Sequence, residues 1–102
     1  MANSLLAGLR PIHPGEVLRE DVLPAVGRSK TEVAKLLGVS RQTLHDLLAE
    51  RQPVTTRMAL RLGRLFGNGP ELWLRLQQNF DLVADAAAMA DELAAIPILE
   101  AA

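Results

Sequence analysis

The segment Lys30-Thr-Glu-Val-Ala-Lys-Leu-Leu-Gly-Val-Ser-Arg-Gln-Thr-Leu-His-Asp-Leu-Leu-Ala49 decides the fold of this chain. Two helices that cross at a tight turn need a small residue at the crossing, a glycine at the turn and apolar residues that hold both helices against a core. Ala34 is the small residue and Gly38 supplies the turn. The pattern therefore predicts a helix-turn-helix over residues 30–50, held by the apolar residues Val33, Leu37, Val39, Leu44 and Leu47.

Capping residues mark the ends of these two helices. Ser29 and Glu32 have the spacing of a capping box, in which each side chain pairs with a free backbone N–H of the other. Gly38 ends the first helix in the left-handed conformation, which glycine adopts at low cost. Ser40 is placed to cap the second helix, which we expect to run toward Arg51.

Further helices are expected on both sides of this motif. Pro14 suits the first position of a helix, which Pro24 should end. A helix from Thr55 or Thr56 should end at Gly67. The longest helix should begin at Pro70, capped by Asn68 or Gly69, and continue to Pro97. With only 3% aromatic residues and few β-branched runs, the chain is predicted to be all-α.

Composition limits the function. A chain of 102 residues, 49% apolar and 23% charged, fits one globular domain, too small for a deep enclosed pocket. The absence of cysteine excludes disulfides and thiolate metal sites. Without a signal-like or long apolar segment, we expect a cytoplasmic protein with no membrane contact. Residues 1–12 are expected to form a flexible arm, residues 13–96 a helical domain that contains the helix-turn-helix, and residues 97–102 a tail.

Charge is divided along the chain although the formal total is only −1. Residues 28–64 carry eight basic and three acidic side chains, a net charge of +5, whereas residues 71–102 carry one basic and six acidic side chains, a net charge of −5. A basic middle segment suggests a polyanionic partner, although a solvated surface is the simpler explanation for any single cation.

The helix after Gly38 has one face that is free to reach DNA. If Leu44, Leu47 and Leu48 point inward, the opposite face is exposed. The first turn of such a helix usually reaches base edges, and glutamine, arginine and the threonine methyl group match adenine, guanine and thymine respectively. Phosphates would repel Asp46 unless its carboxylate accepts a hydrogen bond from cytosine N4 or from a neighbouring side chain. We favour the neighbour, and Gln42 lies one turn earlier. The predicted base contacts are Arg41, Gln42, Thr43 and Asp46.

Phosphate contacts are expected around the starts of the helices, where free N–H groups and the helix dipole favour an anion. Arg57 is notable because a cation in the first turn of a helix is unfavourable unless an anion lies near it. The predicted phosphate contacts are Lys30, Thr31, Lys35, Ser40, Arg51 and Arg57.

The longest predicted helix carries two apolar stripes, more than one helix needs to dock on its own domain. Either the alanine-rich half packs on another molecule, or its alanines reflect helix propensity alone. On the first reading, the dimer interface is predicted at Leu82, Ala86, Met89 and Leu93.

Three blocks of sequence also carry a family resemblance. They are Arg10-Pro-Ile-His-Pro-Gly-Glu-Val-Leu-Arg-Glu-Asp21, Met58-Ala-Leu-Arg-Leu62 and Pro70-Glu-Leu-Trp-Leu-Arg-Leu-Gln-Gln-Asn-Phe-Asp-Leu82. Together with the helix-turn-helix they resemble the HigA antitoxins, a branch of the XRE/Cro-like, lambda repressor-like families. The resemblance implies a five-helix domain with an extended C-terminal helix. It also implies a homodimer that binds an inverted-repeat operator, represses its own operon and neutralises a HigB-like, RelE-like mRNA-cleaving toxin.

Other functions were weighed against this one. His13 and Glu16 are too few to hold a metal, and no nucleophile or oxyanion pattern accompanies the histidines, so we expect neither an enzyme nor a cofactor. A repressor without a toxin partner stays open, as does a protein-interaction module that has lost DNA binding, which Asp46 and the acidic end would favour. A toxin could dock on the arm and first helix or on the acidic long helix, and electrostatics favours the latter.

Overall fold

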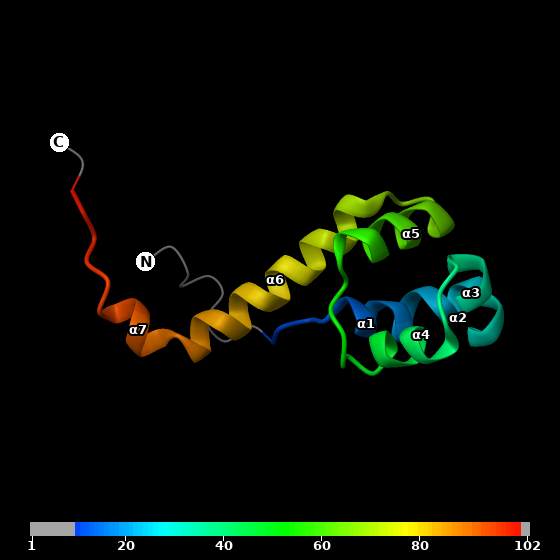
Figure 1. Ribbon diagram of the computed structural model, residues 1–102, viewed down its shortest axis with the longest axis horizontal. Helices are drawn as coiled ribbons and strands as arrows, with labels where there is room; N and C mark the ends of the chain where they lie inside the picture. Colours follow the sequence, from blue (N-terminus) through cyan, green and yellow to red (C-terminus); the bar gives the residue numbers. More distant parts are fainter. Residues whose placement is uncertain (1–9, 101–102) are drawn as a thin grey trace.

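The computed structural model describes residues 10–100, and these residues are helical without a β-strand (Figure 1). The molecule is elongated, with extents of 55 × 26 × 21 Å. A body on one side contains the first helices and the start of the long one, and the rest of the chain projects from it. The elements are α1 (Pro14–Val17), η2 (Leu18–Val22), α2 (Leu23–Val26), α3 (Lys30–Leu37), α4 (Arg41–Leu48), α5 (Thr56–Phe66), α6 (Pro70–Ala88) and α7 (Ala90–Ala94).

The first three elements form one continuous helix, and Pro24 does not end it as predicted. A proline inside a helix lacks an N–H and crowds the carbonyl one turn earlier. Here a π-helical turn precedes it, and the Leu23 N–H donates to the Leu18 carbonyl five residues back. The wider turn accommodates Pro24, and the helix ends instead at Gly27, which has φ of 71°.

The helix-turn-helix prediction is confirmed in α3 and α4. Ser29 Oγ accepts from the Glu32 N–H at 3.1 Å, and Gly38 ends α3 with φ of 76°. Only half of the expected capping box is present, because the Glu32 carboxylate pairs with Arg28 rather than with the Ser29 backbone. Ser40 caps α4 by accepting from the Thr43 N–H at 3.0 Å. The helix ends at Leu48, short of Arg51.

Buried side chains from these helices form one core in the body. Trp73 from α6 is fully buried, and its indole Nε1 donates to Asn68 Oδ1 at 3.0 Å. Val54, between α4 and α5, donates its N–H to Gln77 Oε1 at 2.7 Å, which ties the connecting loop to α6. Thr55 caps α5 and Gly67 ends it, as predicted. The other core residues are Leu18, Leu23, Val33, Ala34, Leu37, Leu44, Leu47, Leu48, Ala59 and Leu62.

The long C-terminal helix is interrupted, which the sequence did not predict. It begins at Pro70, preceded by Gly69, which supplies no side-chain cap. It then stops at Ala88, because Met89 adopts φ of −103° and ψ of 14° before α7 begins. The second half of α6 and α7 project away from the body (Figure 1). With residues 14–26 counted as one helix, the expected five-helix domain with a C-terminal extension is confirmed within residues 10–100.

The predicted N-terminal arm lies mainly outside the described residues, which begin at residue 10. Arg10 is held to the body, since its guanidinium donates to both carboxylate oxygens of Glu16, at 2.7 and 2.9 Å. This pair lowers the pKa of the Glu16 carboxyl and raises that of Arg10. None of the helices within residues 10–100 is long and apolar enough to cross a membrane.

Candidate nucleic-acid interface

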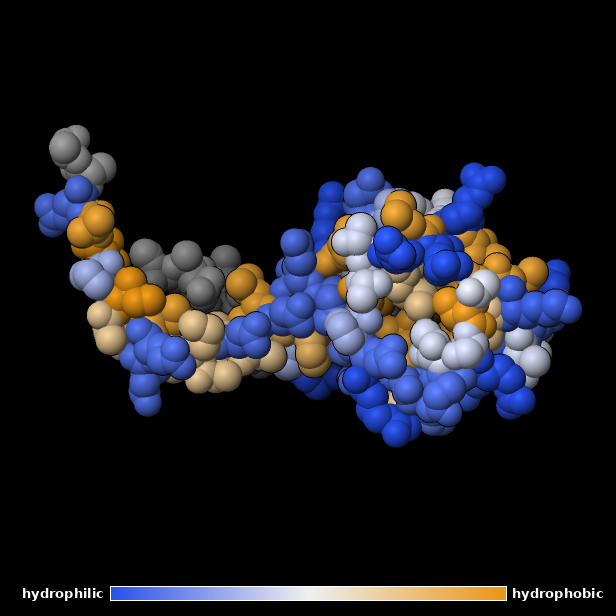
Figure 2. Space-filling model, viewed as in Figure 1, coloured by the Kyte–Doolittle hydropathy of each residue, from blue (hydrophilic) through white to orange (hydrophobic). Residues whose placement is uncertain are grey.

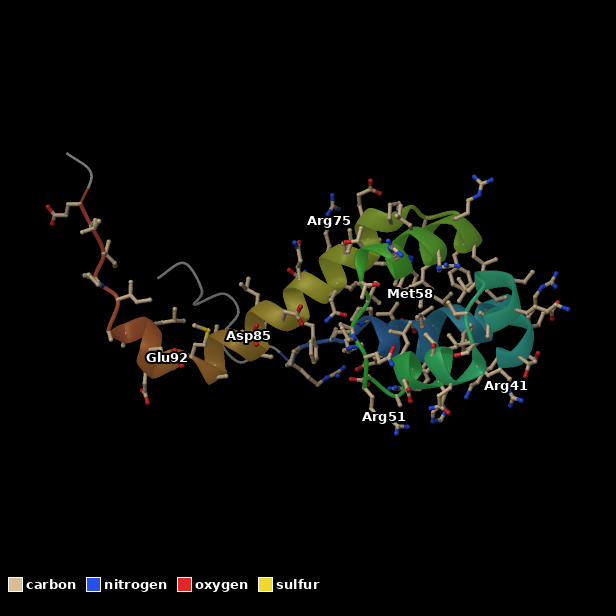
Figure 3. All side chains as sticks on the ribbon, in the orientation of Figure 1. Arg41, Arg51, Met58, Arg75, Asp85 and Glu92 are labelled. Atoms are coloured by element: carbon tan, nitrogen blue, oxygen red, sulfur yellow. The ribbon has the colours of Figure 1, made fainter. Side chains whose placement is uncertain are left out.

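The α4 helix presents two different faces. Leu44 and Leu47 are each 1% exposed and anchor it to the core, and Leu48 is also buried. On the opposite face Gln42 is exposed and Asp46 is half-buried. Arg41, in the first turn of the helix, is exposed, and Thr43 is half-buried. Figure 3 shows Arg41 extending outward at the start of α4. The core residues therefore fix the helix while the predicted base-contacting residues remain accessible.

Neighbouring polar side chains contact the Asp46 carboxylate. Gln42 Nε2 donates to Asp46 Oδ1 at 2.9 Å, which is the pairing that the sequence predicts. Arg51 Nε lies 3.9 Å from the same oxygen. Arg51 Nη2 is also 3.0 Å from the ring nitrogen Nε2 of His45. A carboxylate with a cation nearby repels a phosphate less than a free carboxylate does. Asp46, with Arg51 beside it, should therefore oppose phosphate binding at this face only weakly.

The starts of α3 and α4 meet at a hollow of about 440 Å³ lined by Lys30, Arg41, Gln42 and His45. Its two cations and the nearby start of α4 make it suitable for an anion. The prediction omitted His45, although its spacing of four residues from Arg41 places the two on one helical face. A helical wheel places His45 beside the exposed face, but the hollow that it lines depends on how α3 packs against α4.

The predicted phosphate contacts come from α3, from the residues just before and after α4, and from α5. Lys30, Thr31, Lys35, Arg51 and Arg57 are all exposed. Ser40 is exposed too, but its hydroxyl is occupied, since it accepts from the Thr43 N–H and donates to Thr43 Oγ1 at 2.8 Å. Its role toward a phosphate would therefore fall to its backbone N–H.

The predicted dimer residues lie along a groove on α6 and α7, well away from α4. We call it the C-terminal groove. It has a volume of about 600 Å³ and is lined by Gln78, Asn79, Asp81, Leu82, Asp85, Ala86, Met89 and Leu93. Leu82 is 54% exposed and Leu93 is 45% exposed. Figure 2 shows hydrophobic residues along this projecting part of the chain.

His13 has a structural position rather than one at this interface. It is 3% exposed, and its Nδ1 accepts from the Gly15 N–H at 2.9 Å, which caps α1. Its ring meets Phe80 of α6 edge-on, with centroids 4.9 Å apart. Burial lowers the pKa of His13, and the more distant carboxylates of Glu50 and Asp81 partly oppose this shift. No cluster of three potential metal ligands occurs within the described residues.

The crossing of α3 and α4 at Gly38, together with the polar outer face of α4, defines a helix-turn-helix protein. The helix-turn-helix domain family matches residues 16–76. Antitoxin HigA-1 of Vibrio cholerae is 34% identical over 73 residues, which cover 72% of this chain and 69% of that protein. More narrowly, therefore, the chain belongs to the HigA antitoxin family.

The relatives are similar over most of the chain. Antitoxin HigA of Pseudomonas aeruginosa, solved with the higBA promoter, superposes with a TM-score of 0.84 and is 36% identical, covering 89% of this chain and 100% of that one. Antitoxin GraA in complex with its operator has a TM-score of 0.84 and 42% identity, over 92% of this chain and 96% of that one. Virulence-associated protein I of Dichelobacter nodosus is 42% identical over 71 residues. That match covers 70% of this chain and 66% of that protein, slightly less than two thirds.

Proposed function

We propose that this protein is the antitoxin of a toxin–antitoxin pair, which binds operator DNA as a homodimer, represses its own operon and neutralises a HigB-like, RelE-like toxin. The observation that carries the proposal is the exposed face of α4, with Arg41 and Gln42 outward and Leu44 and Leu47 buried behind them. The relatives solved with a promoter and with an operator support the DNA-binding part.

In this proposal α4 enters the major groove and its first turns read base edges. Arg41 pairs with guanine, the Gln42 amide pairs with adenine, and the Thr43 methyl group contacts thymine. Asp46 holds the Gln42 side chain by accepting from Nε2, so it acts through Gln42 instead of through a base.

Phosphates on both sides of the groove would then be held by the starts of α3 and α4 and by nearby cations. Lys30 lines the hollow at the starts of α3 and α4 and is proposed to contact one phosphate there. Thr31, Lys35, Ser40, Arg51 and Arg57 complete the set of proposed contacts. These contacts carry no sequence information, but they orient the protein on the duplex.

A second copy of the chain is the proposed occupant of the C-terminal groove. Leu82, Ala86, Met89 and Leu93 form its apolar floor, and burying exposed apolar surface favours association. Two copies joined there would present two α4 helices to half-sites about 34 Å apart on one face of the duplex.

The toxin is proposed to dock on the acidic surface of α6 and α7 that the dimer leaves free. RelE-like toxins are expected to be basic, and residues 71–102 carry a net charge of −5. Co-expression with the product of the adjoining gene tests this part. Co-purification of a small basic ribonuclease that is inactive in the complex is the expected result.

The DNA-binding part is tested by titrating the protein onto a labelled fragment of its own promoter. If each subunit neutralises about four phosphates, the logarithm of the binding constant should fall with the logarithm of salt concentration with a slope of about −7. A random duplex of the same length is the control. Binding that is insensitive to salt, or equal for both duplexes, would contradict operator recognition.

A further inference from the structure

Residues of the first helix meet the C-terminal turn of α4, a contact that the predicted interface does not include. The segment His13-Pro14-Gly15-Glu16 and Arg19, one turn after Gly15, belong to the first helix and do not lie at the exposed face of α4. Gly15 and Arg19 instead contact the backbone at the C-terminal end of α4.

Gly15 brings the first helix into direct contact with the backbone of α4. A Cβ atom on Gly15 would lie 2.0 Å from the Leu47 carbonyl oxygen, much closer than van der Waals contact permits. Any larger residue would have to push α4 away or shift the first helix. The Gly15 N–H donates to His13 Nδ1, so the same glycine is also held at the start of α1.

Arg19, one helical turn after Gly15, also contacts the C-terminal turn of α4. Its Nη1 donates to the Leu48 carbonyl oxygen at 2.6 Å and lies 3.2 Å from Glu50 Oε2. The last carbonyls of a helix have no partner within the helix, so a guanidinium there supplies a donor and a favourable charge.

Glu50 shows how tightly this turn is determined. Its N–H donates to the Leu47 carbonyl at 3.0 Å, and the Arg51 N–H donates to the Asp46 carbonyl at 2.8 Å, which together make a Schellman turn. The residue with positive φ in such a turn is usually glycine. In α4 this residue is Glu50, which has φ of 62°. A side chain there is disfavoured by the backbone, and the ion pair with Arg19 offsets part of that cost.

We propose that Gly15 and Arg19 are positioning residues that fix the C-terminal turn of α4 and thereby the orientation in which Arg41 and Gln42 face DNA. This inference rests on the proposed DNA-binding function. Neither residue needs to contact a base. The turn that they hold begins at Asp46, and the Asp46 side chain accepts the hydrogen bond from Gln42. A displacement of the turn would therefore also displace the Gln42 side chain.

The experiment compares Arg19→Ala with Arg75→Ala in the full chain. Arg75 is an exposed arginine on α6 that makes no ion pair within residues 10–100, so its loss changes the net charge equally. In Arg19→Ala the ratio of operator affinity to random-duplex affinity should fall about tenfold, equivalent to about 1.4 kcal/mol. Arg75→Ala should leave the ratio unchanged. Arg19→Lys keeps one donor and should recover part of the loss.

A second measurement does not depend on DNA. Amide hydrogen exchange at Glu50 and Arg51 should become faster in Arg19→Ala than in Arg75→Ala, while amides of α5 keep their protection. The variant Gly15→Ala, if it folds, should show the same pattern. Unchanged exchange at Glu50 and Arg51, or faster exchange with an unchanged affinity ratio, overturns the proposal.

The two measurements also separate this inference from the function on which it rests. If the unmodified protein does not prefer the operator over the random duplex, the proposed function fails and the orientation of α4 toward DNA fails with it. The exchange result then decides alone whether Arg19 fixes the turn.

Discussion

Gln42 and Asp46 are joined across one turn of α4 by a 2.9 Å hydrogen bond from Nε2 to Oδ1. The amide that could read a base is therefore oriented before any DNA arrives, and the Asp46 carboxylate already has a hydrogen-bond donor. This hydrogen bond explains both why an acidic residue is tolerated on the proposed DNA-binding helix and why the Gln42 side chain points as it does.

Substituting Asp46 in two ways separates these effects. Asp46→Asn and Asp46→Ala should both bind random DNA several-fold more tightly, because one negative charge near the phosphates is removed. Only Asp46→Ala should lose preference for the operator, because it leaves no acceptor for Gln42. Fluorescence anisotropy with operator and random duplexes measures both. Equal specificity in the two variants would contradict the role given to the hydrogen bond.

Gln42 and Lys35 should respond differently to truncation. Gln42→Ala should relax preference at one base position, at a cost of about 1–3 kcal/mol on the operator. Lys35→Ala should weaken every sequence alike and reduce the salt slope by about 1. Binding to a set of singly substituted operators distinguishes them. Identical profiles for the two variants would remove the distinction between base and phosphate contacts.

Leu93 tests the proposed dimer interface. Leu93→Glu places a charge in the C-terminal groove and should give monomers with weak operator binding, since paired half-sites would no longer be engaged together. Ile98→Glu is the control because Ile98 is 94% exposed and lies outside the groove. Sedimentation velocity gives the mass of each variant. A dimeric Leu93→Glu would move the interface to another surface.

His13 makes stability depend on pH. Burial keeps the pKa of His13 below its ordinary value in the folded state, so the unfolded chain binds a proton first as pH falls. The contribution of the neutral imidazole is complete above about pH 6.5 and is lost below it, at up to about 1.4 kcal/mol per pH unit. His13→Asn keeps a capping side chain without this titration. Urea unfolding from pH 5 to 8 should show a smaller pH dependence in His13→Asn than in the unmodified protein.

Arg61 links α5 to the turn of the helix-turn-helix. Its Nη1 donates to the Leu37 carbonyl at 2.8 Å beside Gly38. Arg61→Ala should therefore lower the free energy of unfolding by about 1 kcal/mol. Arg64→Ala, on the same helix and also exposed, should change it much less. Chemical denaturation provides the comparison, and equal losses would mean that charge, not the hydrogen bond, is responsible.

Local signals predicted the helices well because each cap acts over three or four residues. Ser29, Ser40 and Thr55 accept from the backbone as their spacing indicates, and Gly38 and Gly67 end their helices. The pairing of Gln42 with Asp46 was predictable for the same reason. Pro24 misled the prediction, because a π-helical turn removes the clash that normally ends a helix at proline.

Contacts between distant parts of the chain were not predictable from such signals. Arg19 lies 29 residues from Leu48, and the sequence contains nothing that pairs the two. The break at Met89 has no glycine or proline to mark it. The hollow that includes His45 required the packing of α3 against α4, which motif spacing alone does not specify.

In the proposed dimer, the projecting half of α6 would make helix formation depend on protein concentration. Its side chains near Leu82 and Met89 have little of the body to pack on, and a short helix without such support is marginal in water. Far-ultraviolet circular dichroism of increasingly dilute samples should therefore show helical signal disappearing as protomers part. The monomer would then expose an unfolded C-terminal segment to proteolysis, from which the proposed dimer would protect it.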